Sequence, residues 1–263
     1  MQTTTDTAEI ISRLDKAILA DPVRNTMFAT VRATLRAAGD GGWSASHRGA
    51  VAARSSTAHP VVVTAGWTEL ALLGKALVDL PTVAGIGGPV ETVEQLVDLL
   101  DRMPATRTVE RLYRLTLLNS PTGVAGTARP ATEWDTDLIA SWLEPYMIET
   151  FGAFPPEYDA ARQAASAIGY SRTWLWLTPS GEPVSMAARR PPAAGVSRIG
   201  PVYTPPYQRG YGYGSAVTAR AVFDILDSGA VPVLYADCSN ATSNKIYRAI
   251  GFRPVTDRLS VTF

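Results

Sequence analysis

One stretch near the C-terminus constrains the fold more than any other: Val202-Tyr203-Thr204-Pro205-Pro206-Tyr207-Gln208-Arg209-Gly210-Tyr211-Gly212-Tyr213-Gly214-Ser215. A β-branched and aromatic run ends there at a double proline and continues through three alternating glycines. The apolar residues that follow, from Val217 to Leu226, recur with helical spacing. The pattern predicts a strand, a turn of bare backbone and the start of a helix.

The alternating glycines predict a binding site for a diphosphate. Without side chains to cover them, the backbone N–H groups from Gly210 to Ser215 are open to a close approach. The positive end of the helix dipole lies at the same place, and Arg209 would add a cation at its mouth. The alternative is a glycine-rich turn that binds nothing, because a lone motif of this kind is weak evidence.

Two other phosphate-binding motifs fit the stretch poorly. A P-loop requires a lysine after its glycines, and none follows here. A dinucleotide-binding fold would carry a third glycine where this chain has Ser215, and its strand would run into the first glycine without a Pro-Pro interruption. Asp237 imitates the ribose-binding acid of that fold, but residues 238–263 are too few for its remaining strands.

A second motif follows the next apolar strand, Val231 to Ala236. It reads Asn240-x-x-Ser243-Asn244-x-x-Tyr247-x-x-x-Gly251-Phe252. Together with Arg209-x-x-Gly212-x-Gly214, this motif resembles the two acyl-CoA signatures of the GNAT superfamily of N-acyltransferases, in the expected order and near the C-terminus.

The resemblance implies an α/β fold with a mixed, mostly antiparallel central sheet flanked by helices. It implies acetyl-CoA or another acyl-CoA as co-substrate, and no metal. The strand before the loop would pair through its backbone with the pantetheine arm, and the loop would hold the diphosphate. The implied cofactor-binding residues are Val202, Tyr203, Thr204, Arg209, Gly210, Tyr211, Gly212, Tyr213, Gly214, Ser215, Asn240, Asn244 and Tyr247.

The same resemblance assigns catalytic roles. Tyr247 matches the usual general acid that assists the leaving thiol, with a buried core tyrosine as the alternative. Asn240 matches the position where two central strands splay apart, although Asn is also a favoured helix cap. Gly251 suits the C-terminal end of the helix.

The general base is less well defined. The strand Ser197 to Tyr203 has no carboxylate, where many members of the superfamily place a glutamate. Asp237 is the first choice, because a carboxylate at a strand end beside the splay would be partly buried. The other candidates are Glu182, Glu144, Glu149 and Glu157. An acyl-cysteine route through Cys238 is disfavoured, because no histidine accompanies it in this part of the chain.

The order of expected elements suggests two parts. Residues 1–122 read as a degenerate N-terminal α/β lobe without the glycine loop, and 123–263 as the catalytic lobe, with a boundary at Ser120 to Gly123. The expected strands are 43–53, 60–65, 82–87, 109–118, 124–128, 173–177, 184–189, 197–203 and 231–236. Thr132 and Asp135 form an imperfect capping box before an amphipathic helix.

The composition of the chain restricts the kinds of partner that the protein is expected to bind. The 263 residues carry 24 basic and 24 acidic side chains and no basic run, which argues against nucleic acid or an anionic membrane as partner. One cysteine excludes an internal disulfide, and no apolar run reaches membrane-spanning length, so a cytoplasmic protein is expected, as a monomer or a homodimer. The predicted activity is transfer of an acetyl or short acyl group to a primary amine of a small molecule by direct attack. The alternative is a non-catalytic, regulatory protein that binds acyl-CoA.

Overall fold

The computed structural model describes residues 1–38, 41–152, 154, 158–170 and 172–263. The chain divides into two compact units, one formed by Met1–Leu112 with Thr256–Phe263 and the other by Tyr113–Val255. This division differs from the predicted boundary after residue 122. The C-terminal segment joins the first unit because Arg258 to Thr262 pair antiparallel with Pro89 to Gly85.

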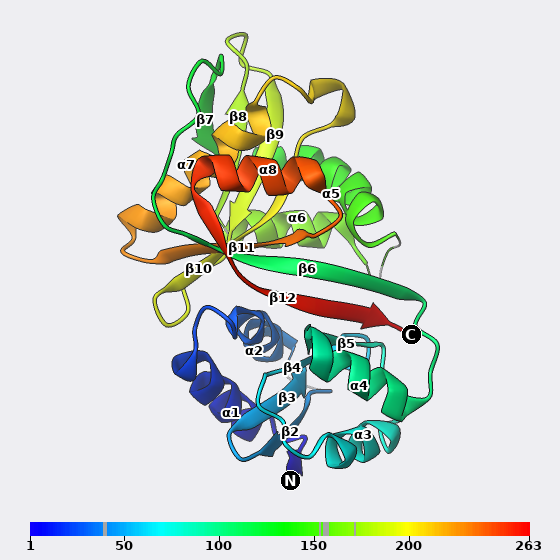
Figure 1. Cartoon of the computed structure of the whole chain (residues 1–263). Helices are drawn as coiled ribbons and strands as arrows, with labels where there is room; N and C mark the ends of the chain where they lie inside the picture. The colour runs from blue at the N-terminus through cyan, green and yellow to red at the C-terminus, as the bar shows by residue number, and fades with distance from the viewer. Residues whose placement is uncertain (39–40, 153, 155–157, 171) are drawn as a thin grey trace. The chain divides into compact units, whose positions relative to one another are not determined.

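Both units repeat one order of elements: a strand, two helices, three strands, a helix, a strand and a helix (Figure 1). In the first unit these are β1 (Gln2–Thr4), α1 (Thr7–Ala20), α2 (Thr26–Ala38), β2 (Trp43–His47), β3 (Ala50–Arg54), β4 (Val61–Val63), α3 (Leu70–Val78), β5 (Gly85–Pro89) and α4 (Val90–Leu100). In the second they are β7 (Thr127–Pro130), α5 (Thr136–Phe151), α6 (Ala160–Gly169), β8 (Arg172–Leu177), β9 (Pro183–Arg189), β10 (Val196–Tyr203), α7 (Tyr213–Asp227), β11 (Val231–Asp237) and α8 (Ala241–Ile250). Strands β6 (Thr106–Leu115) and β12 (Phe252–Thr262) each follow one of these series.

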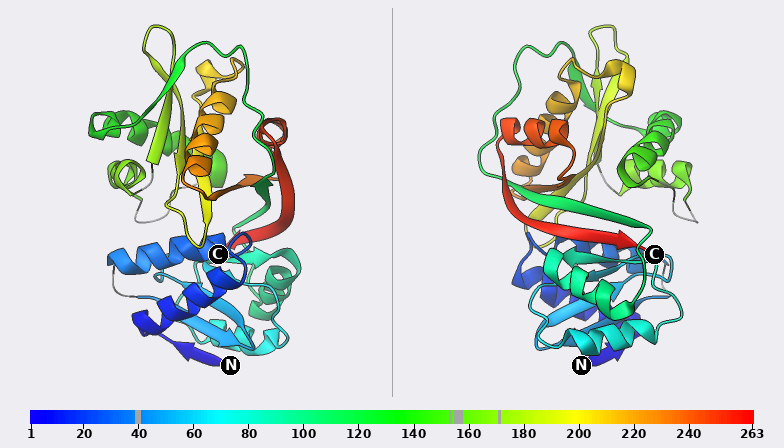
Figure 2. Two further views of the ribbon diagram at one scale, coloured as in Figure 1. Left: turned by 90° about the vertical axis from the view of Figure 1, so that its left-hand side faces the viewer. Right: turned by 45° about the vertical axis from the view of Figure 1, so that its right-hand side comes forward.

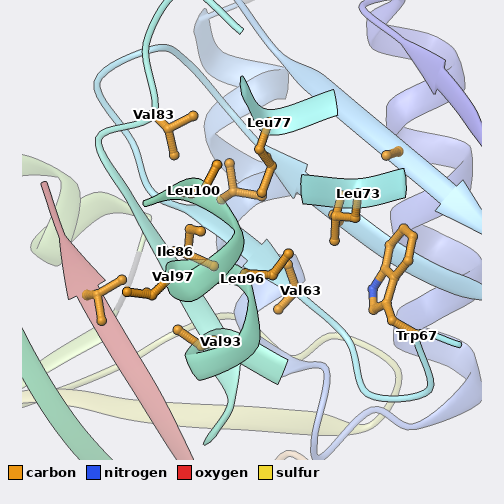
Figure 3. Close-up of a cluster of buried hydrophobic side chains, with 14 of the residues drawn as sticks. Val63, Trp67, Leu73, Leu77, Val83, Ile86, Val93, Leu96, Val97 and Leu100 are labelled. Atoms are coloured by element: carbon orange, nitrogen blue, oxygen red, sulfur yellow. The ribbon is translucent and has the colours of Figure 1, made fainter. Parts of the chain in front are cut away.

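The first unit has its own core. Its sheet has the order β1-β2-β3-β4-β5-β12, with α1 and α2 packed together and α3 and α4 packed together. Side chains from α3 and α4 meet those of the strands in one apolar cluster, which includes Leu73, Leu77, Ile86 and Leu96 (Figure 3). Trp67, in the connection from β4 to α3, is 8% exposed and belongs to this cluster. In the first unit, the connection that corresponds in order to the glycine loop therefore carries a buried tryptophan.

The second unit positions the candidate site. Its strands follow the order β11-β10-β9-β8-β7, and every neighbouring pair is antiparallel except β10 and β11. Helices α5 and α6 cover one face of this sheet, and α7 and α8 cover the other (Figure 2). The mixed, mostly antiparallel α/β fold predicted from the sequence is confirmed.

The prediction of a single strand over 43–53 is wrong. The segment forms a hairpin of β2 and β3, in which Trp43 pairs with Arg54 and His47 with Ala50. Arg48 and Gly49 both adopt positive φ angles, 49° and 89°, as a two-residue hairpin turn requires.

Two predicted helix ends are confirmed. The Thr132 N–H donates to Asp135 Oδ2 at 2.8 Å in a complete capping box that begins the short helical turn before α5. Gly251 ends α8 with a φ of 113°, and a Cβ there would lie 1.8 Å from the carbonyl oxygen of Leu117. Only glycine fits at that position.

Candidate active site

The glycine loop leads from β10 into α7 as predicted. Gly210 and Gly212 have φ angles of 89° and 84°, in the left-handed region that favours glycine, and Gly212 is the N-cap of α7. The N–H of Ala216 donates to the carbonyl of Gly212 at 3.0 Å. The amides of residues 213–215 precede the first intrahelical bond and have no acceptor within the helix. They form a ready site for an anion.

The same glycines let the loop lie close to its neighbours. A Cβ on Gly212 would be 3.0 Å from Val124 Cγ2, and one on Gly214 would be 3.1 Å from Thr204 Oγ1. The Thr204 hydroxyl is in turn held by a 2.8 Å hydrogen bond with the Ser185 hydroxyl. The first turn of α7 is thus held against the end of β10.

Strands β10 and β11 separate beside this loop. They pair in parallel from Val196–Val231 to Ile199–Leu234, and the pairing ends there. Strand β10 continues on its other edge, where Val202 pairs with Ala187 in β9 after a bulge. After Ile199, the backbone groups on the edge of β10 that faces β11 are no longer paired with β11. These are the groups to which an extended ligand could add as a strand.

Arg209 folds back over the loop. Its Nε donates to the Thr204 carbonyl at 2.9 Å, and its Nη2 donates to both Glu149 carboxylate oxygens at 3.0 and 2.7 Å. The guanidinium also lies 5.8 Å from the ring centroid of Tyr203. The expected cation is present at the mouth of the loop, in an ion pair with α5. Sequence reasoning gave no sign of this pairing, because sixty positions separate the two residues.

The implied binding residues on the loop and strand differ in exposure. Tyr211 is 64% exposed and stacks on Tyr213 with ring centroids 5.6 Å apart. Tyr203 is buried, with its ring against α5 and α6, so only its backbone is available to a ligand. Val202 is partly buried and Ser215 lies in the first turn of α7.

Two asparagines organise the start of α8. Asn240 is the N-cap, and its Oδ1 accepts the N–H of Ser243 at 2.9 Å. Asn244 is buried; it accepts the Tyr113 hydroxyl at 2.6 Å and donates to the carbonyls of Asp237 and Asn240 at 2.7 and 2.8 Å. The Asn244 amide thus uses both of its donors and its acceptor within the protein. It ties the end of β11 to the helix.

Tyr247 lies in the apolar core between α8 and the sheet. It is 9% exposed, and its ring meets that of Phe252 edge-on with centroids 6.2 Å apart. Burial raises the pKa of the Tyr247 phenol well above its ordinary value, and Tyr146 on α5 raises it further. Among the described residues, none forms a hydrogen bond with its hydroxyl. The Tyr247 phenol is therefore protonated at neutral pH.

The candidate carboxylates are placed as follows. Asp237 ends β11, and its Oδ1 accepts the N–H and hydroxyl of Ser239 at 2.8 and 2.7 Å. Glu149 is committed to Arg209. Glu144 and Glu182 are exposed on α5 and on the turn from β8 to β9, and Glu157 lies outside the described residues. Asp237 is the described carboxylate that stands at the end of a splayed strand.

Sequence reasoning missed Tyr113, Ser185 and Tyr146. Tyr113 anchors Asn244, Ser185 orients Thr204, and Tyr146 acts on the pKa of Tyr247. Each belongs to an ordinary strand or helix pattern, so only tertiary contacts reveal them. Among the described residues, no three His, Cys, Asp or Glu side chains are grouped to hold a metal ion, and every helix is too short or too polar to cross a bilayer.

Comparisons with known proteins agree on the fold. A family model described as FR47-like protein matches residues 179–261, and no curated protein matches the chain. A Drosophila protein of known structure has a TM-score of 0.67 at 12% identity, covering 100% of this chain and 98% of that one.

Two similar structures carry enzyme names. A GNAT-family acetyltransferase from Colwellia psychrerythraea has a TM-score of 0.64 at 11% identity, with both chains covered completely. A GCN5-related N-acetyltransferase from Sphaerobacter thermophilus has a TM-score of 0.62 at 16% identity, covering 99% of this chain and 94% of that one. The chain therefore has the fold of GNAT acetyltransferases, with an FR47-like region at residues 179–261.

Proposed function

We propose that this protein is a CoA-dependent N-acyltransferase that transfers an acetyl or short acyl group to a primary amine of a small molecule. One observation carries the proposal: the pairing of β10 with β11 ends at Ile199 and Leu234, directly beside an uncovered helix start. An acyl-CoA offers both matching parts, an amide-bearing arm for the strand edge and a diphosphate for the helix.

The donor would bind along β10 and the loop. The backbone of Val202 to Thr204 would pair with the pantetheine amides, and the amides of residues 213–215 would take the diphosphate. Arg209 lies at the same mouth, and it would exchange part of its pairing with Glu149 for the diphosphate. Acetyl-CoA supplies the acyl group as a thioester, and no metal is part of this scheme.

The transfer is a direct displacement. The amine nitrogen attacks the thioester carbonyl; a C–N bond forms, the C–S bond breaks and the electron pair of that bond leaves on sulfur. Tyr247 would donate a hydrogen bond to the departing thiolate, because its raised pKa keeps the phenol protonated. Backbone N–H groups at the splayed edge would stabilise the oxyanion.

The amine must also lose a proton. We assign this proton to Asp237, directly or through a water molecule, because its Oδ2 forms no hydrogen bond to any described residue while Oδ1 is held by Ser239. An amine with a pKa near 8 costs about 1 kcal/mol to deprotonate at pH 7, whereas one near 10.4 costs about 4–5 kcal/mol. A weak base is therefore sufficient for acceptors of the first kind.

The absence of a carboxylate from β10 favours one second candidate. Strand β10 reads Val-Ser-Arg-Ile-Gly-Pro-Val-Tyr, so it has no acidic residue on the strand where many members of the superfamily carry a glutamate as general base. A protein that binds acyl-CoA as a regulatory ligand, without turnover, would have the same loop and splay.

Calorimetric titration and a thiol-release assay distinguish these functions. Acetyl-CoA and free CoA are titrated into the wild type, into an Arg209→Ala, Gly212→Asp variant and into a matched Arg36→Ala, Gly229→Asp control. We expect the wild type and the control to bind and the loop variant to lose binding. Thiol release with a panel of amines then supports the enzyme, whereas binding without release supports the regulatory protein. No binding by the folded wild type would refute both.

A further inference from the structure

An arginine beside the splay, Arg190, has no carboxylate partner among the described residues. Its side chain is partly buried, and its Nε atom is buried without a hydrogen bond to any of those residues. Burial lowers its pKa, while Tyr170 and Tyr146 act in the opposite direction. The group stays charged, because an arginine pKa is far above neutral. A partly desolvated charge without a counter-ion favours an anion at this place.

The strand register fixes the face on which Arg190 lies. Ile199 pairs with Arg189, and the N–H of Arg190 donates to the carbonyl of Arg198 at 2.9 Å. Arg190 and Arg198 are therefore opposite each other and share one face of the sheet. Arg189 reaches Asp224 of α7 on the other face. By alternation, the two opposed arginines lie on the face that α5 and α6 cover.

Arg190 stands at the point where β10 and β11 stop pairing, because it lies opposite Arg198 and Ile199 is the last residue of β10 that pairs with β11. Its guanidinium therefore places a positive charge at the base of the splay.

The acceptor would approach the thioester from this face. The glycine loop begins α7, so a bound diphosphate would lie at the end of a helix on the opposite face. An amine has to reach the thioester from a side that the donor does not fill. Tyr146 connects the two groups, because this one phenol acts on the pKa of both Arg190 and Tyr247.

We propose that Arg190 binds a carboxylate of the acceptor, so that the substrate class is amines that carry a carboxylate, as amino acids do. A guanidinium matches a carboxylate with two parallel hydrogen bonds and fixes its orientation. This inference rests on the proposed acyl transfer and narrows its acceptor.

The test compares matched acceptors. Thiol release from acetyl-CoA is measured with α-, β- and γ-amino acids and with the carboxamide of each, so that only the negative charge differs within a pair. We expect wild-type kcat/KM to be at least tenfold higher for the acids. Arg190→Gln should abolish this preference through KM, Arg190→Lys should restore part of it, and the control Arg36→Gln should leave it unchanged.

Measurements of acetyl-CoA affinity and of melting temperature show whether an Arg190 variant affects the acceptor, the donor or the fold. Acetyl-CoA affinity should be the same in all these variants, and Arg190→Gln should not lower the melting temperature, because no internal partner is lost. The inference is wrong if amides react as well as acids, if Arg190→Gln keeps the preference, or if that variant is strongly destabilised. A silent panel with bound acetyl-CoA overturns the acceptor class alone, whereas absence of acetyl-CoA binding overturns the proposed function and this inference with it.

Discussion

The hydroxyl of Tyr247 gives the sharpest test of the mechanism. Tyr247→Phe removes one oxygen from a buried ring that keeps its contact with Phe252. No described residue bonds to that hydroxyl, so its loss breaks no hydrogen bond to those residues and should not lower the free energy of unfolding. If it donates to the leaving thiolate, the transition state loses a hydrogen bond to a charged group, worth about 1.5–3 kcal/mol. This corresponds to a roughly 10- to 150-fold lower rate.

Single-turnover thiol release measures the chemical step, and calorimetry measures acetyl-CoA affinity, which should not change. The control is Tyr207→Phe, the same chemical change on a side chain that is 75% exposed near the loop. Because burial raises the pKa of Tyr247, the phenol stays protonated as the pH rises, and it should cause no loss of rate between pH 7 and 10. A Tyr247→Phe rate within twofold of wild type would refute the assigned role.

Three further predictions follow from the fold and the loop. Gly212→Ala and the control Gly229→Ala both force alanine into positive φ at a cost of roughly 1–2 kcal/mol, but calorimetry should show at least tenfold weaker acetyl-CoA binding only for Gly212→Ala. The hydrogen bond from Arg129 is the main cause that lowers the pKa of Asp135 to about 2. The charged carboxylate therefore adds about 2 kcal/mol to the free energy of unfolding above pH 4, and this stability is lost as the pH falls toward 2. In urea unfolding, Asp135→Asn should show the full loss at pH 7 and little effect at pH 2. Asn244→Ala leaves the buried Tyr113 hydroxyl without its acceptor and should cost roughly 1–3 kcal/mol, and adding Tyr113→Phe should recover part of this in a double-mutant cycle. The first prediction is contradicted if both glycine variants lose the same acetyl-CoA affinity, and the second if Asp135→Asn lowers stability equally at pH 7 and pH 2. The third is contradicted if the stability losses of Asn244→Ala and Tyr113→Phe simply add.

The sequence alone determined the local parts of the site. Alternating glycines after a double proline predicted the loop and the start of α7, because positive φ and uncovered amides are properties of the residues themselves. Asn240 as a cap, Gly251 as a helix end and the Thr132 capping box follow from the same short-range rules. The paired motifs indicated the fold that the comparisons then showed.

Tertiary structure alone decided what stands around these elements. The register that ends the pairing of β10 and β11, the return of β12 to the first unit, and the pairing of Arg209 with Glu149 all join residues far apart in the sequence. No local propensity encodes such contacts, because they depend on which faces the packed strands and helices turn toward each other. The same holds for Arg190: an arginine after a strand becomes a partly buried charge with no carboxylate partner among the described residues only when β9 and β10 are aligned beneath α5 and α6.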